Sequence, residues 1–187
     1  MNMEIINIKK SIECVLFISE KPVPVETFYK LFPDSKKSEI RQCLAELVVE
    51  WRELERGFML HEVAGGYQLR TRNEYSDVIL KYKQLKPYKL SRAALEVLAI
   101  IAYRHPITRV EIDRIRGVDS SGVVGILLDK ELIEIKGRKE VLGRPFLYAI
   151  TDKFLETFSL KSLDDLPTLK EIDGIDSTLN EQTSVRA

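Results

Sequence analysis

Residues 106–150 decide the fold of the second half of the chain, and they read PITRVEIDRIRGVDSSGVVGILLDKELIEIKGRKEVLGRPFLYAI. Thr108 and Glu111 have the spacing of a capping box, in which each side chain accepts a hydrogen bond from a free backbone N–H at a helix start. A short helix is therefore predicted over 109–116. Gly117 ends it, because glycine readily adopts the left-handed conformation common at helix ends.

A further helix and a hairpin complete this stretch. Asp119-Ser120-Ser121 can cap a helix that reaches about Glu131, and strands are predicted over 132–136 and 146–150, joined by the loop 137–145. Upstream, a helix over 91–104 ends at His105-Pro106. Downstream, Thr151 caps a last helix over 152–158. Three helices closed by a two-stranded wing are the winged-helix variant of the helix-turn-helix.

The first half repeats this plan. Helices are predicted over 8–20, over 25–32 and from a cap at Asp34 or Ser35 to about Glu55, and a tight Gly65-Gly66 turn joins strands over 58–63 and 67–71. An extra helix covers 74–85. Pro22 and Pro106 stand at the same joint of the two halves. We therefore expect a mostly helical α+β protein with winged-helix domains over 1–88 and 89–160, and an acidic, weakly ordered tail over 161–187.

Charge and composition exclude several classes of protein. The 187 residues hold 29 basic and 29 acidic side chains, with a pI of about 6.8, whereas a nucleic-acid-coating domain would have a pI above about 9. No apolar stretch approaches the ~20 residues of a membrane span. In the first ten residues the basic side chains follow the apolar ones, which is not the order of a signal peptide. A cytoplasmic protein without a membrane partner is expected.

The sequence offers little for catalysis. His61 and His105 fall in different predicted domains, and neither has a Cys or carboxylate at metal-ligand spacing. Cys14 and Cys43 lie beside apolar helix positions, so both are expected to be small buried hydrophobes rather than nucleophiles. Neither a nucleophile elbow nor a phosphate-binding loop motif occurs. We therefore expect no catalytic residue, no metal, no cofactor and no enzymatic activity.

The helix over 91–104 is apolar on nearly every side. Between Ala93 and Tyr103, Glu96 is the one charged residue. A helix of this kind must be covered on more than one side. Either its own domain buries it, or a partner chain covers part of it. In the second case the contact residues are Leu95, Ala99, Ala102 and Tyr103.

The second wing carries the candidate phosphate contacts Arg138, Lys139 and Arg144, unless its tip is simply solvated. The helix that would enter the major groove, 121–131, has no Asn, Gln or Arg to read base edges. Both domains therefore resemble protein-binding more than DNA-reading winged helices.

Several short segments are specific enough to indicate a family. They are Leu95-Glu96-Val97-Leu98, Ile101-Ala102-Tyr103-Arg104, Pro106-Ile107-Thr108-Arg109, Ile115-Arg116-Gly117-Val118, Gly143-Arg144-Pro145 with Tyr148, and Phe154-Leu155. With them, residues 90–169 closely resemble the segregation and condensation protein B family, the accessory subunits of the bacterial SMC–kleisin condensin complex. The first half is similar mainly in plan.

The resemblance implies a non-enzymatic homodimer joined through the N-terminal domains. It implies binding to the central region of the kleisin ScpA, contact with the SMC protein only through the kleisin, and weak or indirect contact with DNA. The role would be chromosome condensation and segregation at cell division, in the cytoplasm and on the nucleoid. The kleisin is then expected on Leu95, Ala99, Ala102 and Tyr103.

The dimer contacts are expected on the seam Leu47, Trp51 and Leu54, unless that seam is the core of its own domain. The competing hypothesis for the whole chain is a tandem winged-helix DNA-binding transcription regulator.

Overall fold

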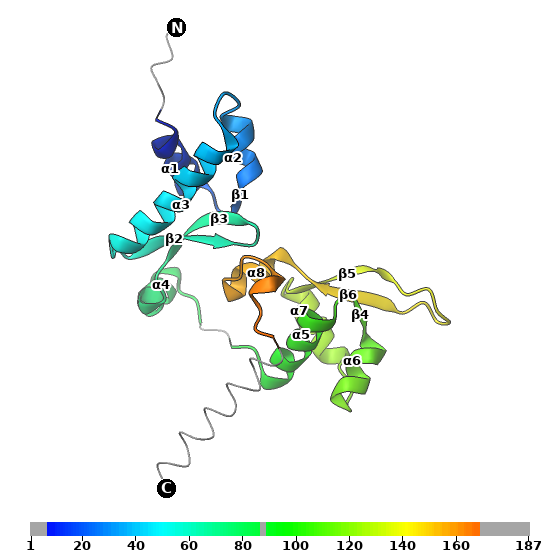
Figure 1. The fold of residues 1–187 in the computed structure, drawn as a ribbon. Helices are drawn as coiled ribbons and strands as arrows, with labels where there is room; N and C mark the ends of the chain where they lie inside the picture. Colours follow the sequence, from blue (N-terminus) through cyan, green and yellow to red (C-terminus); the bar gives the residue numbers. More distant parts are fainter. Residues whose placement is uncertain (1–6, 87–88, 169–187) are drawn as a thin grey trace, which may run out of the picture.

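The computed structural model describes residues 7–86 and 89–168, which form two domains with the same order of elements. The first contains α1 (Ile8–Ile18), β1 (Val23–Pro24), α2 (Val25–Leu31), α3 (Lys37–Glu53), β2 (Phe58–Val63) and β3 (Gly66–Thr71). The second contains α5 (Arg92–Arg104), β4 (Ile107–Thr108), α6 (Arg109–Arg116), α7 (Ser121–Asp129), β5 (Ile133–Arg138) and β6 (Phe146–Ile150). The predicted tandem winged-helix fold is confirmed (Figure 1).

Each domain contains a three-stranded antiparallel sheet, in which the short first strand pairs with the last. The strand orders are β1-β3-β2 and β4-β6-β5. Val23 pairs with Tyr67 in the first sheet, and Ile107 with Tyr148 in the second. The sequence pattern did not predict β1 and β4, because two residues are too few to show the alternation of a strand. β1 follows Pro22 and β4 follows Pro106, so the repeated proline marks the short strand that each domain adds to its hairpin.

The turn of the first hairpin lies one residue earlier than predicted. Val63 pairs with Gly66, so the turn is Ala64-Gly65, whose φ angles are 48° and 69°. Positive φ at both positions suits the two-residue turns of hairpins. Gly66 belongs to β3, where a Cβ would come within 2.8 Å of the Val23 backbone. A glycine at this position therefore lets β1 and β3 pair.

The helix ends follow the prediction more closely in the second domain than in the first. Thr108 and Glu111 form the capping box of α6, and Gly117 ends α6 with a φ of 75°. Thr151 caps α8 (Asp152–Phe158) through the N–H of Phe154. The predicted cap of α3 at Asp34 or Ser35 is wrong: the residue before α3 is Lys36, whose side chain makes no capping hydrogen bond.

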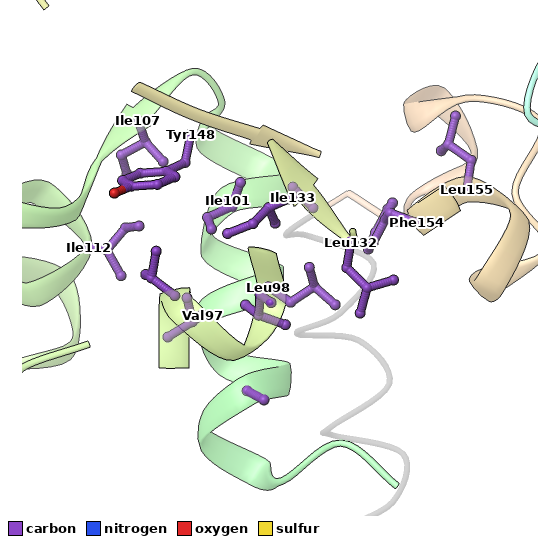
Figure 2. Packing of buried hydrophobic residues seen from close by; sticks show 14 residues of the cluster. Val97, Leu98, Ile101, Ile107, Ile112, Leu132, Ile133, Tyr148, Phe154 and Leu155 are labelled. Atoms are coloured by element: carbon purple, nitrogen blue, oxygen red, sulfur yellow. The ribbon is translucent and has the colours of Figure 1, made fainter. Parts of the chain in front are cut away.

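Each domain has a hydrophobic core of its own. In the second core, Val97, Leu98 and Ile101 of α5 lie beside Ile112 of α6 and beside Ile133 and Tyr148 of the sheet (Figure 2). Full burial of a side chain of this size contributes ~1.5–3 kcal/mol, so these faces hold the helices on the sheet. The first core consists of Ile12, Leu16, Val23, Phe28, Ile40, Leu44, Leu47 and Leu60.

The remaining elements lie after each domain. The turn η1 (Asn73–Tyr75) and helix α4 (Ser76–Lys83) follow the first, and the turn η2 (Leu163–Asp165) follows α8. Residues 161–168 differ from the expected weak order, because Leu163 and Leu166 pack against the second core. The rest of the expected tail lies outside the described residues. Within the described ranges no helix is both long and apolar enough to cross a membrane.

Candidate protein-binding site

Helix α5 presents two different apolar faces. The inner face consists of Ala94, Val97, Leu98, Ile101 and Ala102, each at most 5% exposed. The outer face carries Leu95, Ala99 and Tyr103 at intervals of four residues, and all three are exposed. The Ser91 side chain starts the helix by accepting a hydrogen bond from the Ala94 N–H. A helix that is apolar nearly all round is thus divided into a core stripe and a surface stripe.

The structure brings three of the four predicted partner contacts to the surface. Ala102 does not join them, because it is packed in the core. Tyr103 is partly engaged within the chain, since its hydroxyl donates to the Pro167 carbonyl oxygen at 2.6 Å. Leu95 and Ala99 are therefore the strongest of the predicted contacts.

Leu95 lines a groove of about 730 Å³ between the start of α5, the end of α7 and α8. The apolar lining residues are Leu90, Leu95, Leu132 and Phe158. Lys89, Lys130 and Lys153 also line the groove, together with the acidic Asp129. Lys153 Nζ lies 2.7 Å from Glu131 Oε2. An apolar groove with more positive than negative lining residues suits an apolar anchor flanked by carboxylates.

Sequence reasoning identified Leu95 and missed Leu90, Leu132 and Phe158. These residues come from three separate segments, and no local spacing connects them. Leu132 opens a predicted strand and Phe158 ends a predicted helix. The sequence therefore showed only that Leu132 and Phe158 lie at the ends of predicted elements. That position indicates a groove only when the fold is known.

Arg138 and Lys139 of the second wing are engaged within the domain. The Arg138 guanidinium lies 4.1 Å from the Phe146 ring centroid, and its Nη1 donates to the Arg144 carbonyl oxygen at 3.1 Å. Lys139 Nζ lies 2.5 Å from Glu111 Oε1. The hydrogen bonds from Lys139 and Thr108 lower the pKa of Glu111 to about 2. Phosphate contact by Arg138, Lys139 and Arg144 stays a prediction.

The face of α7 that would meet a DNA groove is smooth and apolar. A Cβ added at Gly122 or Gly125 would meet no atom within 4 Å, and Ile126 is 47% exposed. Arg109, at the start of α6, pairs with Asp119 just before α7, with Nη1 2.9 Å from Oδ1. This surface suits another protein better than base edges.

The predicted dimer seam of the first domain is divided between core and surface. Leu47 is fully buried in the core, Trp51 is partly buried with its ring centroid 5.0 Å from that of Phe58, and Leu54 is 54% exposed. Nearby, α4 buries none of its residues and exposes Val78 and Tyr82. Helix α4 therefore offers exposed apolar surface that the sequence did not indicate, and Phe17 and Ile18 at the end of α1 offer a second such surface.

Residues with potential chemistry lie apart. Cys14 is exposed and Cys43 half-buried, so the expectation that both are buried is wrong. Burial raises the pKa of the Cys43 thiol. Burial, with Arg70 and Arg72 nearby, lowers the pKa of His61. In the part of the chain that the structure describes, no three His, Cys, Asp or Glu side chains group as a metal site.

Comparisons with known proteins give matches over most of the chain. A family model described as the segregation and condensation complex subunit ScpB matches residues 10–169. The segregation and condensation protein B of Syntrophotalea carbinolica is 50% identical over 169 residues, which cover 90% of this chain and 85% of that protein.

Two solved structures are similar at lower identity. The crystal structure of ScpB from Mycobacterium tuberculosis is 27% identical, covers 86% of this chain and 99% of that chain, and has a TM-score of 0.39. A dimer of the ScpB N-terminal domain complexed with ScpA peptide is 24% identical, covers 40% of this chain and 91% of that chain, and has a TM-score of 0.36.

Proposed function

The chain belongs to the ScpB family of segregation and condensation complex subunits, and on that premise we propose that it binds the central region of the kleisin ScpA within an SMC–kleisin complex. It acts as a homodimer and catalyses no reaction of its own. It reaches the SMC protein through the kleisin, in the cytoplasm and on the nucleoid. Its contribution is to chromosome condensation and segregation at cell division.

The groove beside α5 is the observation that supports this proposal. Leu95 lines the groove, and Ala99 and Tyr103 continue the exposed outer face of α5 at intervals of four residues. A partner helix with apolar residues at every third or fourth position fits such a surface. A carboxylate beside its anchor would face Lys89 at the edge of the groove. We therefore propose that an amphipathic kleisin helix with acidic flanks docks here.

The transcription-regulator alternative finds less support. Helix α7 presents Gly122, Gly125 and Ile126, and the wing residues Arg138 and Lys139 contact Phe146 and Glu111. Non-specific binding depends on the number of phosphates that basic side chains neutralise. Gel shifts on random duplex at about 50 and about 200 mM salt should show weak binding with a shallow salt dependence. Tight binding to one duplex sequence would support the regulator instead.

The dimer is proposed to form through the first domain. Helix α4 exposes Val78 and Tyr82, which are 64% and 82% exposed, and Leu54 adds apolar surface at the end of α3. A second copy that covers these residues would remove them from water. Of the predicted seam, Leu54 remains a proposed dimer contact, whereas Leu47 is buried in the core of its own domain.

The deciding experiment measures binding of the full chain to purified ScpA by calorimetry. Leu95→Glu should weaken binding at least about tenfold, because it places a charge in the apolar groove. Val110→Glu is the matched control, since Val110 and Leu95 are 56% and 45% exposed and α6 contributes no lining residue to the groove. Equal affinity of the Leu95→Glu chain and the wild type would remove the groove from the interface. Absence of binding by the wild type would refute the proposed partner.

A further inference from the structure

The segment that follows α8 connects the two domains. The turn of the β2–β3 hairpin donates two backbone hydrogen bonds to it, from the Ala64 N–H to the Leu160 carbonyl and from the Gly65 N–H to the Lys161 carbonyl, both at 2.9 Å. In Figure 1 the hairpin tip points toward the end of α8. The first domain thus contacts residues 96 positions further along the chain.

Side chains strengthen this contact on both sides of the hairpin. Lys161 Nζ lies 2.8 Å from Glu62 Oε2, and Arg70 Nη1 donates to Ser159 Oγ at 3.1 Å. Ala64 packs against the second core although it belongs to the first domain. The joint therefore combines backbone hydrogen bonds, an ion pair and apolar packing, which together define one relative orientation.

The same segment is held to the second domain by its other residues. Leu160, Leu163 and Leu166 pack against the second core. The Lys161 N–H donates to Asp165 Oδ2 at 2.7 Å, which closes a turn around η2. At its far end, the Pro167 carbonyl accepts the hydrogen bond from the Tyr103 hydroxyl at the end of α5.

We infer that residues 159–167 form a strap that fixes the angle between the two winged-helix domains. Residues 84–91 join the domains covalently, and the strap adds a second connection from α8 back to the hairpin of the first domain. Two connections at separate points restrict rotation that one flexible linker would allow. The strap also places Tyr103 in a structural role, because its hydroxyl anchors the far end.

Amide exchange by NMR on the full chain tests the strap directly. In the wild type, the Ala64 and Gly65 amides should exchange slowly although they lie in a hairpin turn. Replacing both Leu163 and Leu166 with Asp should speed their exchange at least about tenfold, because local opening exposes both amides to water. The His61 amide, which lies in a hydrogen-bonded pair with Gln68 inside the β2–β3 ladder, is the internal reference and should not change.

A charge reversal provides a second variant that leaves the apolar contacts intact. Lys161→Glu opposes Glu62 and should speed exchange at Ala64 and Gly65, and Glu62→Lys in the same chain should restore slow exchange. Arg109→Glu is the matched control, because it breaks the Arg109–Asp119 ion pair within the second domain. Residual dipolar couplings should fit one alignment tensor in the wild type and two in the Leu163→Asp, Leu166→Asp chain. Fast exchange at both amides in the wild type, or two tensors there, would overturn the inference.

Discussion

The two winged helices share one order of elements but differ in their third helix. Helix α3 has 17 residues and a charged outer face, where Lys9 of α1 pairs with Glu46 and Glu50. Helix α7 has nine residues and an outer face of glycine and aliphatic side chains. The order of elements and the buried faces therefore determine the fold, and the outer faces are free to differ in function.

The domains also differ in where they leave apolar surface. In the first domain α4, which follows the hairpin, exposes Val78 and Tyr82, whereas in the second domain Leu95 is exposed on α5 and in the adjoining groove. We assign the first surface to a second copy of the chain and the second to the kleisin. Each of the following predictions tests whether a change in one domain leaves the stability and the binding of the other domain unaffected.

The largest effect is expected from matched truncations in the two cores. Leu44→Ala and Ile101→Ala each remove a fully buried side chain and should destabilise their own domain by about 2–5 kcal/mol. Trp51 is the single tryptophan of the chain and lies in the first domain, so its fluorescence follows that domain, while circular dichroism follows both. Leu44→Ala should shift the fluorescence transition in denaturant and Ile101→Ala should not. Equal shifts in both variants would show that the domains unfold as one unit.

The next effect concerns the dimer. Tyr82→Glu places a charge on the exposed face of α4 and should raise the dimer dissociation constant of the full chain at least about tenfold. Light scattering over a range of concentrations measures this change. Leu142→Glu on the second wing is the control, because Leu142 is fully exposed there. A Tyr82→Glu chain that stays dimeric at wild-type concentrations would move the interface away from α4.

A smaller effect is expected from Ala99→Glu. Ala99 is exposed on the outer face of α5, so the substitution should leave the melting temperature unchanged and weaken ScpA binding about five- to tenfold. Calorimetry and a thermal melt on the same samples separate the two effects. Val110→Glu, on the exposed surface of α6, serves as the control. Loss of folding in the Ala99→Glu chain would instead place Ala99 in the core.

The smallest effect depends on pH and on the capping box that Thr108 and Glu111 form at the start of α6. Glu111 has a folded-state pKa of about 2, below its ordinary 4.5, so its stabilisation is present above about pH 4.5 and is lost as the pH falls toward 2. The Glu111 side chain is 37% exposed, so solvent screening limits the effect to about 1 kcal/mol.

Glu111→Gln should therefore destabilise the second domain at pH 7, and the difference from the wild type should shrink by pH 3. Denaturation followed by circular dichroism measures this difference. The corresponding helix α2 starts after Pro24 without a side-chain cap, so Trp51 fluorescence should not report it. A constant difference between pH 7 and pH 3 would contradict the assigned pKa.

Local signals predicted most of the fold. Capping chemistry placed both ends of α6. The prediction was less accurate where the backbone departs from the common residue preference, as at Ala64, a non-glycine residue with positive φ in the turn.

The candidate site was predicted only in part, because the hydrophobicity of a residue does not tell whether its side chain faces the core or the solvent. Ala99 and Ala102 are the same residue type on one apolar helix, and only packing decides that one faces water and the other the core. The other walls of the groove, Leu90, Leu132 and Phe158, meet through tertiary structure alone. The strap was missed for the same reason, since its composition resembled that of a solvated tail.

The strap also sets the order of events during synthesis. The turn at Ala64-Gly65 leaves the ribosome well before its acceptors at Leu160 and Lys161, and at about 5–20 residues per second the interval is roughly 5–20 s. Each domain can complete its own sheet in that time, because the pairs within each sheet are much closer in sequence. The joint is therefore among the last contacts to form, and a nascent chain that stops before residue 159 would carry two folded domains without a fixed orientation.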